Sequence, residues 1–217
     1  SETVRVAKLT VAVCGFYELY FNGVKITKGL LSPYISNTDD YIYYDEYEVK
    51  LREGENVIGA ILGNGFQNNP GGHIWEFDKS PFRSAPMMSV SVEVDGETVL
   101  MSDDSFKIHE SPVRYDDYRF GEYYDANYKI DSWCNIGFDD SEWDNALIGK
   151  APAGELRIAD VAPIVKEKEI SPIGILKHGE SYIYDFGESN AGVCRLKISG
   201  KPGQTVTMRF ADSLDDS

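Results

Sequence analysis

The chain is poor in cysteine and in positive charge, and it has no long apolar run. Its three cysteines, Cys14, Cys134 and Cys194, lie far apart, match no CxxC metal spacing and cannot all pair with one another. No apolar run approaches the roughly 18 residues of a membrane helix. The 36 acidic residues outnumber the 21 basic ones, which gives a net charge of −15. This charge argues against nucleic acid and membrane surfaces as partners and favours neutral or cationic ligands.

Helical periodicity is also lacking, because no stretch longer than about ten residues shows it. Alternating β-branched and aromatic runs predict strands instead, with Asn22-Gly23 and Asp95-Gly96 as hairpin turns. These expected strands cover residues 4–13, 16–21, 24–26, 41–49, 87–94, 98–101, 106–110, 182–186, 193–199 and 205–210. Their number and spacing predict an all-β chain built as a jelly-roll-like β-sandwich.

Residues 54–66 combine a turn, a short apolar run and an abrupt Gly-rich stop. Val57 to Leu62 predicts a strand that is covered on both faces, and Gly63-Asn64-Gly65 ends it. A polar, Gly-rich loop follows to residue 73. An ordinary core strand with an ordinary turn is one interpretation. The other is that this strand end presents groups to a ligand, because functional residues are common on loops held by a rigid scaffold.

Four motifs resemble those of one known family. Residues 17–23 have the sequence YELYFNG, close to the family's YELYLNG, and residues 62–66 have LGNGF where members usually have GNGW. GEYYDA at 121–126 and FDDSEW at 138–143 form the third motif. YDFGESNAG at 184–192 resembles the DFGQNxAG that opens the family's next β-sandwich. In this order they resemble the N-terminal region of bacterial α-L-rhamnosidases over nearly the whole chain.

The resemblance implies a domain plan and a role. Residues 1–160 would form the jelly-roll, carbohydrate-binding-like N-terminal domain, and residues 161–217 would begin a second, incomplete β-sandwich. Alternatively, the strands after Glu169 complete the first sandwich. In the family, carboxylates of a later α/α barrel hydrolyse the glycoside, so this chain is expected to be a non-catalytic piece of a longer enzyme. The compartment stays open, with a periplasmic or extracellular place favoured for the parent enzyme.

A sugar site needs planar hydrogen-bonding side chains and an aromatic face. Loop residues of these types are the candidates: Asn37, Asp39, Asp40, Asn64, Phe66, Asn68, Asn69, Trp75, Asp116 and Asp117. Phe66 stands where the family often has Trp, so Trp75 or Tyr118 would supply the stacking ring. No cofactor is required, but a calcium ion at Asp39 and Asp40, or at Asp116 and Asp117, is an option, since some similar modules hold L-rhamnose through calcium. The simpler interpretation is that these Asn and Asp residues cap their own turns.

Three functions remain open from the sequence. The chain would bind a neutral sugar such as L-rhamnose, within a rhamnose-containing glycan, or support the catalytic domain. It would otherwise be a structural spacer without a ligand, or an enzyme in its own right. The Tyr- and Arg-rich residues 114–124 have a second use as an interface with the rest of the parent enzyme, because aromatic residues and Arg are enriched at interfaces.

Overall fold

The computed structural model describes residues 5–70 and 76–211. The chain divides into two compact units, residues 1–165 and 166–217. Strands are the main regular elements of both units, and the helical elements of the described part are two short 3₁₀ turns, Phe77–Lys79 and Ala126–Tyr128. The predicted all-β class is therefore confirmed. In these ranges no helix is long and apolar enough to cross a membrane.

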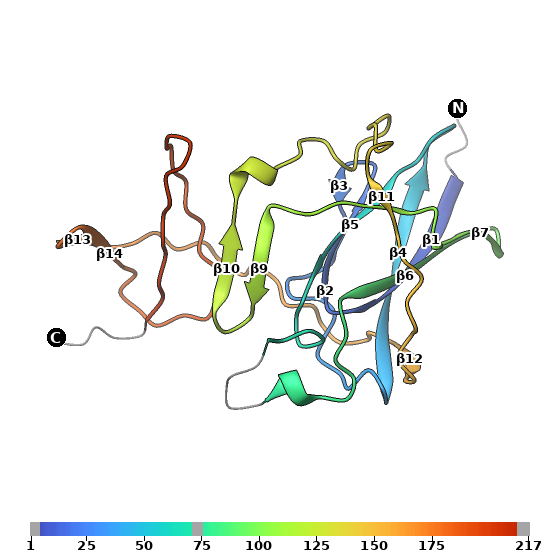
Figure 1. The fold of residues 1–217 in the computed structure, drawn as a ribbon, viewed down its shortest axis with the longest axis horizontal. Helices are drawn as coiled ribbons and strands as arrows, with labels where there is room; N and C mark the ends of the chain where they lie inside the picture. Colours follow the sequence, from blue (N-terminus) through green and yellow to red (C-terminus); the bar gives the residue numbers. More distant parts are fainter. Residues whose placement is uncertain (1–4, 71–75, 212–217) are drawn as a thin grey trace. The chain divides into compact units, whose positions relative to one another are not determined.

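Two sheets form the sandwich of the first unit (Figure 1). The five-stranded sheet has the order β12-β4-β1-β6-β7, in which β12 runs parallel to β4 and the other neighbours are antiparallel. The three-stranded sheet has the order β3-β2-β5 and is antiparallel. The strands are β1 (Arg5–Cys14), β2 (Phe16–Phe21), β3 (Val24–Lys25), β4 (Tyr41–Leu51), β5 (Ile58–Gly63), β6 (Met87–Val94), β7 (Glu97–Met101) and β12 (Glu155–Ile158).

The core lies between the two sheets and follows the alternation seen in the sequence. Every second residue of β1 and β2 is buried, so that one face of each strand points inward. Residues of β4 and β6 complete the same apolar cluster. Its members are Ala7, Leu9, Val11, Val13, Tyr17, Leu19, Phe21, Tyr47, Val49, Val90, Val92 and Val94. A sandwich of two packed layers results.

Strand β5 has neighbours on both faces, as predicted, but none of its residues is fully buried. Ile58 and Ala60 pack against the core. On the other face, a Cβ atom added to Gly59 would lie 2.6 Å from Cζ3 of Trp133, so the glycine makes room for the indole. Burial is incomplete because β5 pairs only with β2 and lies at the edge of its sheet.

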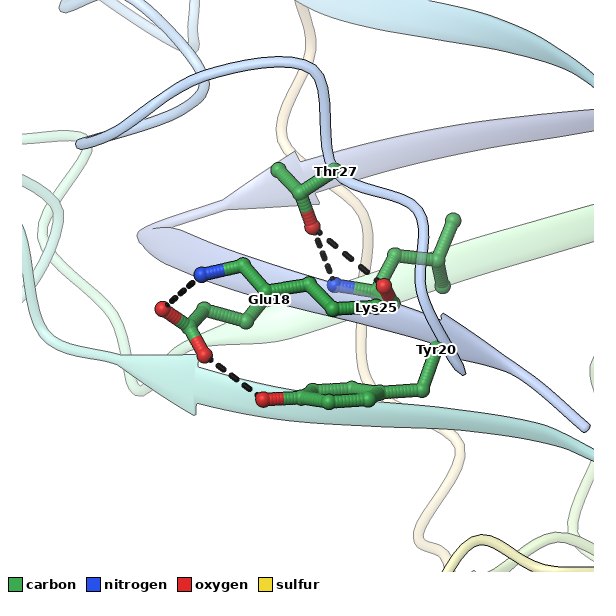
Figure 2. Close-up of polar contacts among 5 residues, drawn as sticks. Glu18, Tyr20, Lys25 and Thr27 are labelled. Atoms are coloured by element: carbon green, nitrogen blue, oxygen red, sulfur yellow. Dashed lines mark hydrogen bonds and ion pairs between the residues drawn. The ribbon is translucent and has the colours of Figure 1, made fainter. Parts of the chain in front are cut away.

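The outer face of β2 carries a polar cluster that ties this strand to β3 and the segment after it (Figure 2). The Tyr20 hydroxyl donates to Glu18 Oε2 at 2.8 Å, and the Lys25 ammonium forms an ion pair with Glu18 Oε1. Thr27 Oγ1 accepts from the backbone N–H of Leu19 at 2.6 Å. These bonds hold β3 and the segment after it against β2. The predicted Asn22-Gly23 turn between β2 and β3 is confirmed by positive φ angles of 49° and 81°.

Two short ribbons pair only within themselves. Strand β8 (Lys107–Ile108) pairs with β11 (Asp144–Asn145), and β9 (Val113–Asp117) pairs with β10 (Gly121–Tyr124). Figure 1 shows β9 and β10 as a hairpin separate from both sheets. Among the described residues no backbone ladder joins this hairpin to the sandwich, so side-chain contacts are the ones that hold it.

The second unit contains one hairpin, β13 (Gly174–His178) with β14 (Ser181–Asp185). Strand β14 confirms the strand predicted at 182–186. The strands predicted at 193–199 and 205–210 are wrong, because the structure assigns no strand there. Apolar side chains of these segments are exposed, with Val193 at 77% and Phe210 at 71%. Alternation alone does not make a strand when no backbone ladder forms beside it.

Candidate functional site

The candidate residues come from three segments of the first unit. Residues 36–40 precede β4, residues 64–69 follow β5, and residues 116–120 include the turn between β9 and β10. Side-chain hydrogen bonds join the second segment to each of the others. The three segments, with the bonds that join them, are called the loop cluster below.

Asp116 binds the first residue after β5. Its Oδ2 accepts from the backbone N–H of Asn64 at 2.7 Å, and its Oδ1 accepts from the Asn64 side-chain amide at 2.8 Å. Burial raises the pKa of the Asp116 carboxyl, against the opposing effect of the backbone N–H groups of Asn64 and Gly65. The absence of a side chain at Gly63 permits this approach, because a Cβ atom there would lie 3.2 Å from Oδ2.

Asp117 is a second attachment and is buried, with 4% exposed. Its Oδ2 accepts from the Asn69 amide at 3.2 Å, and Asn69 is also buried. Its Oδ1 accepts from the backbone N–H groups of Arg119 and Phe120 at 2.7 and 2.8 Å. This carboxylate therefore shapes the β9–β10 turn and fixes the turn to residue 69 at the same time.

Gln67 and Thr38 join the remaining segment, and the sequence analysis named neither of them. Thr38 Oγ1 donates to Gln67 Oε1 at 3.0 Å, and both residues are buried. The Gln67 amide nitrogen donates to the Phe82 carbonyl and to Ser84 Oγ. No sequence signal separates this Gln from an ordinary loop residue, because its burial depends on segments far away in the chain.

Apart from the core hydroxyls of Tyr17 and Tyr47, the buried polar side chains of the described ranges all belong to the loop cluster: Thr38, Gln67, Asn69 and Asp117. Burying a polar group costs free energy unless it is hydrogen-bonded. Each of these four has a partner within the cluster. The loops are therefore held to one another by specific bonds rather than by apolar contact alone.

Phe66, a candidate residue at the position where the family often has Trp, is surrounded by three rings. It makes edge contacts with Phe16 and Phe77, at centroid distances of 5.9 and 5.4 Å. Tyr118 lies against it at 4.5 Å with a tilt of 42°. Phe66 thus positions Tyr118, which was named as a substitute ring. Trp75, the other substitute, lies outside the described residues.

Asn37, Asp39 and Asp40 form a local turn. Asn37 Oδ1 accepts from the backbone N–H of Asp39 at 3.1 Å, and its amide nitrogen donates to Asp40 Oδ2 at 2.8 Å. This is the self-capping arrangement that turn chemistry predicts. All three side chains are nevertheless exposed, and Thr38 between them is attached to Gln67, so they lie on the accessible side of the loop cluster.

Comparison with known proteins decides the family. The model of the α-L-rhamnosidase N-terminal domain matches residues 2–168, and the bacterial α-L-rhamnosidase concanavalin-like domain matches residues 176–217. The chain belongs to the α-L-rhamnosidase N-terminal domain family. Among curated relatives, an α-L-rhamnosidase of Formosa agariphila is 30% identical over 217 residues, covering 96% of this chain and 23% of the relative. One of Alteromonas sp. is 28% identical, covering 96% and 23%.

Solved structures agree with this family. The α-L-rhamnosidase of Dictyoglumus thermophilum has a TM-score of 0.75 and 32% identity, covering 86% of this chain and 21% of that one. The Streptomyces avermitilis α-L-rhamnosidase complexed with L-rhamnose has a TM-score of 0.72 and covers 81% and 17%. At 24% identity the latter shows the fold alone. The chain spans less than a quarter of the length of these rhamnosidases.

Calcium fits this rhamnosidase domain poorly at the two expected places. Both carboxylates at 116 and 117 already accept N–H donors on each of their oxygens. One oxygen of Asp40 accepts from Asn37. In residues 5–70 and 76–211, no group of three or more His, Cys, Asp or Glu side chains could hold a metal ion. The donor sets favour hydrogen bonding within the protein, so no chemical step is assigned to calcium.

A depression of about 460 Å³ lies elsewhere on the rhamnosidase domain, over β1, β4 and β6. Its charged side chains include Lys8, which lies 3.7 Å from Glu46 and 3.3 Å from Glu93. None of the candidate residues that the structure describes lines it. The sequence-based candidates and this depression are separate features of the surface.

Proposed function

We propose that this chain is a non-catalytic accessory part of an α-L-rhamnosidase and that its loop cluster binds a neutral sugar such as L-rhamnose. The observation that carries the proposal is that, apart from the core tyrosine hydroxyls, the buried polar side chains of the described chain lie in this one cluster: Thr38, Gln67, Asn69 and Asp117. Such a network rigidifies the loops that it joins. Rigid loops hold recognition groups in place before a ligand arrives, which lowers the entropic cost of binding.

The groups available to a sugar lie on the exposed side of this network. Asp39 and Asp40 are exposed, while Asn68 and Tyr118 are half-buried. They offer carboxylate and amide hydrogen bonders together with one aromatic ring, which is what vicinal hydroxyls and the apolar face of a sugar need. The Streptomyces avermitilis structure of the same fold is a complex with L-rhamnose, which supports this sugar as the first ligand to test.

Hydrolysis by the parent enzyme would reside outside this chain, which spans less than a quarter of the relatives' length. Incubation of the chain with an aryl α-L-rhamnoside tests this part of the proposal. No release of the aryl alcohol above a buffer control is expected. Release that scales with protein concentration would show that the chain is an enzyme in its own right.

Isothermal titration calorimetry with L-rhamnose tests the binding part. Parallel titrations with calcium and with a chelator show whether the ion matters. Asp39→Ala is expected to weaken binding at least tenfold, because it removes an exposed hydrogen bonder without touching the buried network. Asp104→Ala, at an exposed aspartate outside the cluster, is the matched control and should bind as the unmodified chain does.

A structural support without ligand is the second candidate, and one observation favours it. The hydrogen-bonding groups of Asn64, Asp116 and Asp117 are already used by one another and by their neighbours. If no heat is detected with L-rhamnose in either calcium condition, these bonds serve only to hold the β9–β10 hairpin. The sugar proposal would then be wrong, while the place of the chain in its family would stand.

A further inference from the structure

The exposed aromatic side chains of the first unit are concentrated in one short segment. Among its described residues, the aromatic side chains that are more than about 40% exposed all lie between positions 115 and 128. They are Tyr115, Phe120, Tyr123, Tyr124 and Tyr128, and this set is called the aromatic ribbon. The other aromatic residues that the structure describes in this unit are more covered. Aromatic groups gathered on an exposed surface mark a binding surface more often than chance exposure does.

Strand geometry places two of these rings side by side. Tyr115 on β9 is the direct cross-strand partner of Tyr123 on β10. Successive side chains of a strand point to opposite faces, so both rings lie on the face opposite to Asp116, whose carboxylate binds Asn64. Tyr115 is 42% exposed and Tyr123 is 55% exposed. Asp116 and Asp117 thus attach the hairpin at its turn end, through opposite faces of β9, and the exposed tyrosine pair lies next to them, further from the turn.

A third ring of the ribbon is held in place by charge. The Arg114 guanidinium lies 4.2 Å from the centroid of the Tyr128 ring. Arg114 also forms an ion pair with Glu110 at 2.7 Å. These contacts restrict Tyr128 before any ligand binds, and a restricted ring loses less side-chain entropy on binding.

The ribbon is continuous with the loop cluster. Tyr118, which packs against Phe66, and Phe120, which is 66% exposed, both lie in the turn that joins β9 to β10. A ligand that reaches beyond the loop cluster at this turn meets the ribbon next. Four of the five rings are tyrosines, which combine an apolar ring face with a hydroxyl. A chain of sugars has the same two kinds of surface.

We infer that the aromatic ribbon extends the sugar site and holds further residues of a neutral, rhamnose-containing glycan whose end occupies the loop cluster. The inference rests on the proposed function, because it needs a sugar at the loop cluster to define the direction of the chain. A net charge of −15 disfavours acidic polysaccharides and leaves a neutral glycan as the fitting class. The competing occupant is a protein surface of the parent enzyme, which would give no dependence on glycan length.

Calorimetric titration of the whole 217-residue chain with two ligands tests the inference. The first ligand is L-rhamnose, and the second is a neutral tetrasaccharide that ends in L-rhamnose. We expect the tetrasaccharide to bind about tenfold more tightly. Tyr123→Ala is expected to abolish that gain while leaving the affinity for L-rhamnose unchanged. Tyr123→Phe is expected to keep the gain, because stacking uses the ring and not the hydroxyl.

Tyr182→Ala is the matched control, since Tyr182 is a 59% exposed tyrosine on a strand of the other hairpin. It should keep both affinities. Equal affinities of the unmodified chain for the two ligands would overturn the inference and favour a protein partner. A length-dependent gain that survives in Tyr123→Ala would overturn it as well. Absence of binding by L-rhamnose is a separate result, which contradicts the proposed function itself.

Discussion

Replacing Asp116 with alanine tests whether side chains hold the β9–β10 hairpin. The hairpin shares no backbone ladder with either sheet, and the Asp116 carboxylate accepts both the backbone N–H and the side-chain amide of Asn64. The substitution removes the acceptor and leaves those two donors without it. If the attachment is what the structure shows, the hairpin should loosen at this end.

The magnitude follows from the two bonds and from burial. A hydrogen bond to a charged group contributes about 1.5–3 kcal/mol net, so two of them give roughly 3–6 kcal/mol. Burial raises the pKa of Asp116, which means that the ionised carboxylate is itself partly destabilised in the folded chain. Its removal recovers part of the loss. We therefore expect the free energy of unfolding of the first unit to fall by about 2–4 kcal/mol.

Urea denaturation followed by tryptophan fluorescence measures this loss, and hydrogen exchange locates it. The Asn64 and Gly65 amide protons should exchange faster in the variant, whereas those of the central strand β1 should change least. Glu122→Ala is the control, because Glu122 is the exposed cross-strand partner of Asp116 on the same hairpin. It should alter stability by no more than about 0.5 kcal/mol. Equal effects of the two substitutions would refute the attachment.

Two further substitutions examine neighbouring parts of the argument. Gly59→Ala should destabilise the first unit by about 1–3 kcal/mol, because the added Cβ would lie 2.6 Å from Cζ3 of Trp133. Gly149→Ala is the control. Its Cβ would meet only ordinary contacts at 3.8 Å or more, so it should be nearly neutral in the same denaturation assay. Thr38→Val should lower the free energy of unfolding by about 1–3 kcal/mol, because it leaves the buried Gln67 Oε1 without its donor. Thr38→Ser keeps the hydroxyl and should lower it less. Equal losses of stability in thermal denaturation would contradict this role of Thr38.

The strands of the sandwich could be predicted from the sequence, because alternation and turn residues are local patterns along the chain. Alternating apolar residues produced β1, β2 and β6, and Asp95-Gly96 adopts the positive φ angles of 53° and 85° that a tight hairpin turn requires. The alternation of apolar residues predicted strands at 193–199 and 205–210 that do not form, because neither described segment is paired with a neighbouring strand. A pattern of side chains sets which face of a strand is apolar, but a strand exists only where backbone groups find partners.

The loop cluster was predictable in its residue types but not in its bonds. Asn64 and Asp116 are 52 positions apart, so nothing near either residue indicates that they meet. Gln67 was missed for the same reason, since its partners come from residues 38, 82 and 84. Phe66 was identified by its motif position, but nothing near it in the sequence indicates that its ring meets Phe16, Phe77 and Tyr118.

The distribution of buried polarity distinguishes this end of the sandwich from the rest of it. The core between the sheets is apolar apart from tyrosine hydroxyls, and replacing both partners of a buried hydrogen bond by apolar groups of the same shape can be nearly neutral for stability. Hydrogen bonds add direction, because they are lost when the donor and acceptor turn away from one another. In this cluster, buried amides and a carboxylate fix the orientation of the loops. The cluster is therefore suited to keep Tyr118 and the exposed Asp39 and Asp40 in fixed positions. Fixed positions matter little to a spacer, whereas a sugar, which is recognised by the directions of its hydroxyl groups, depends on them.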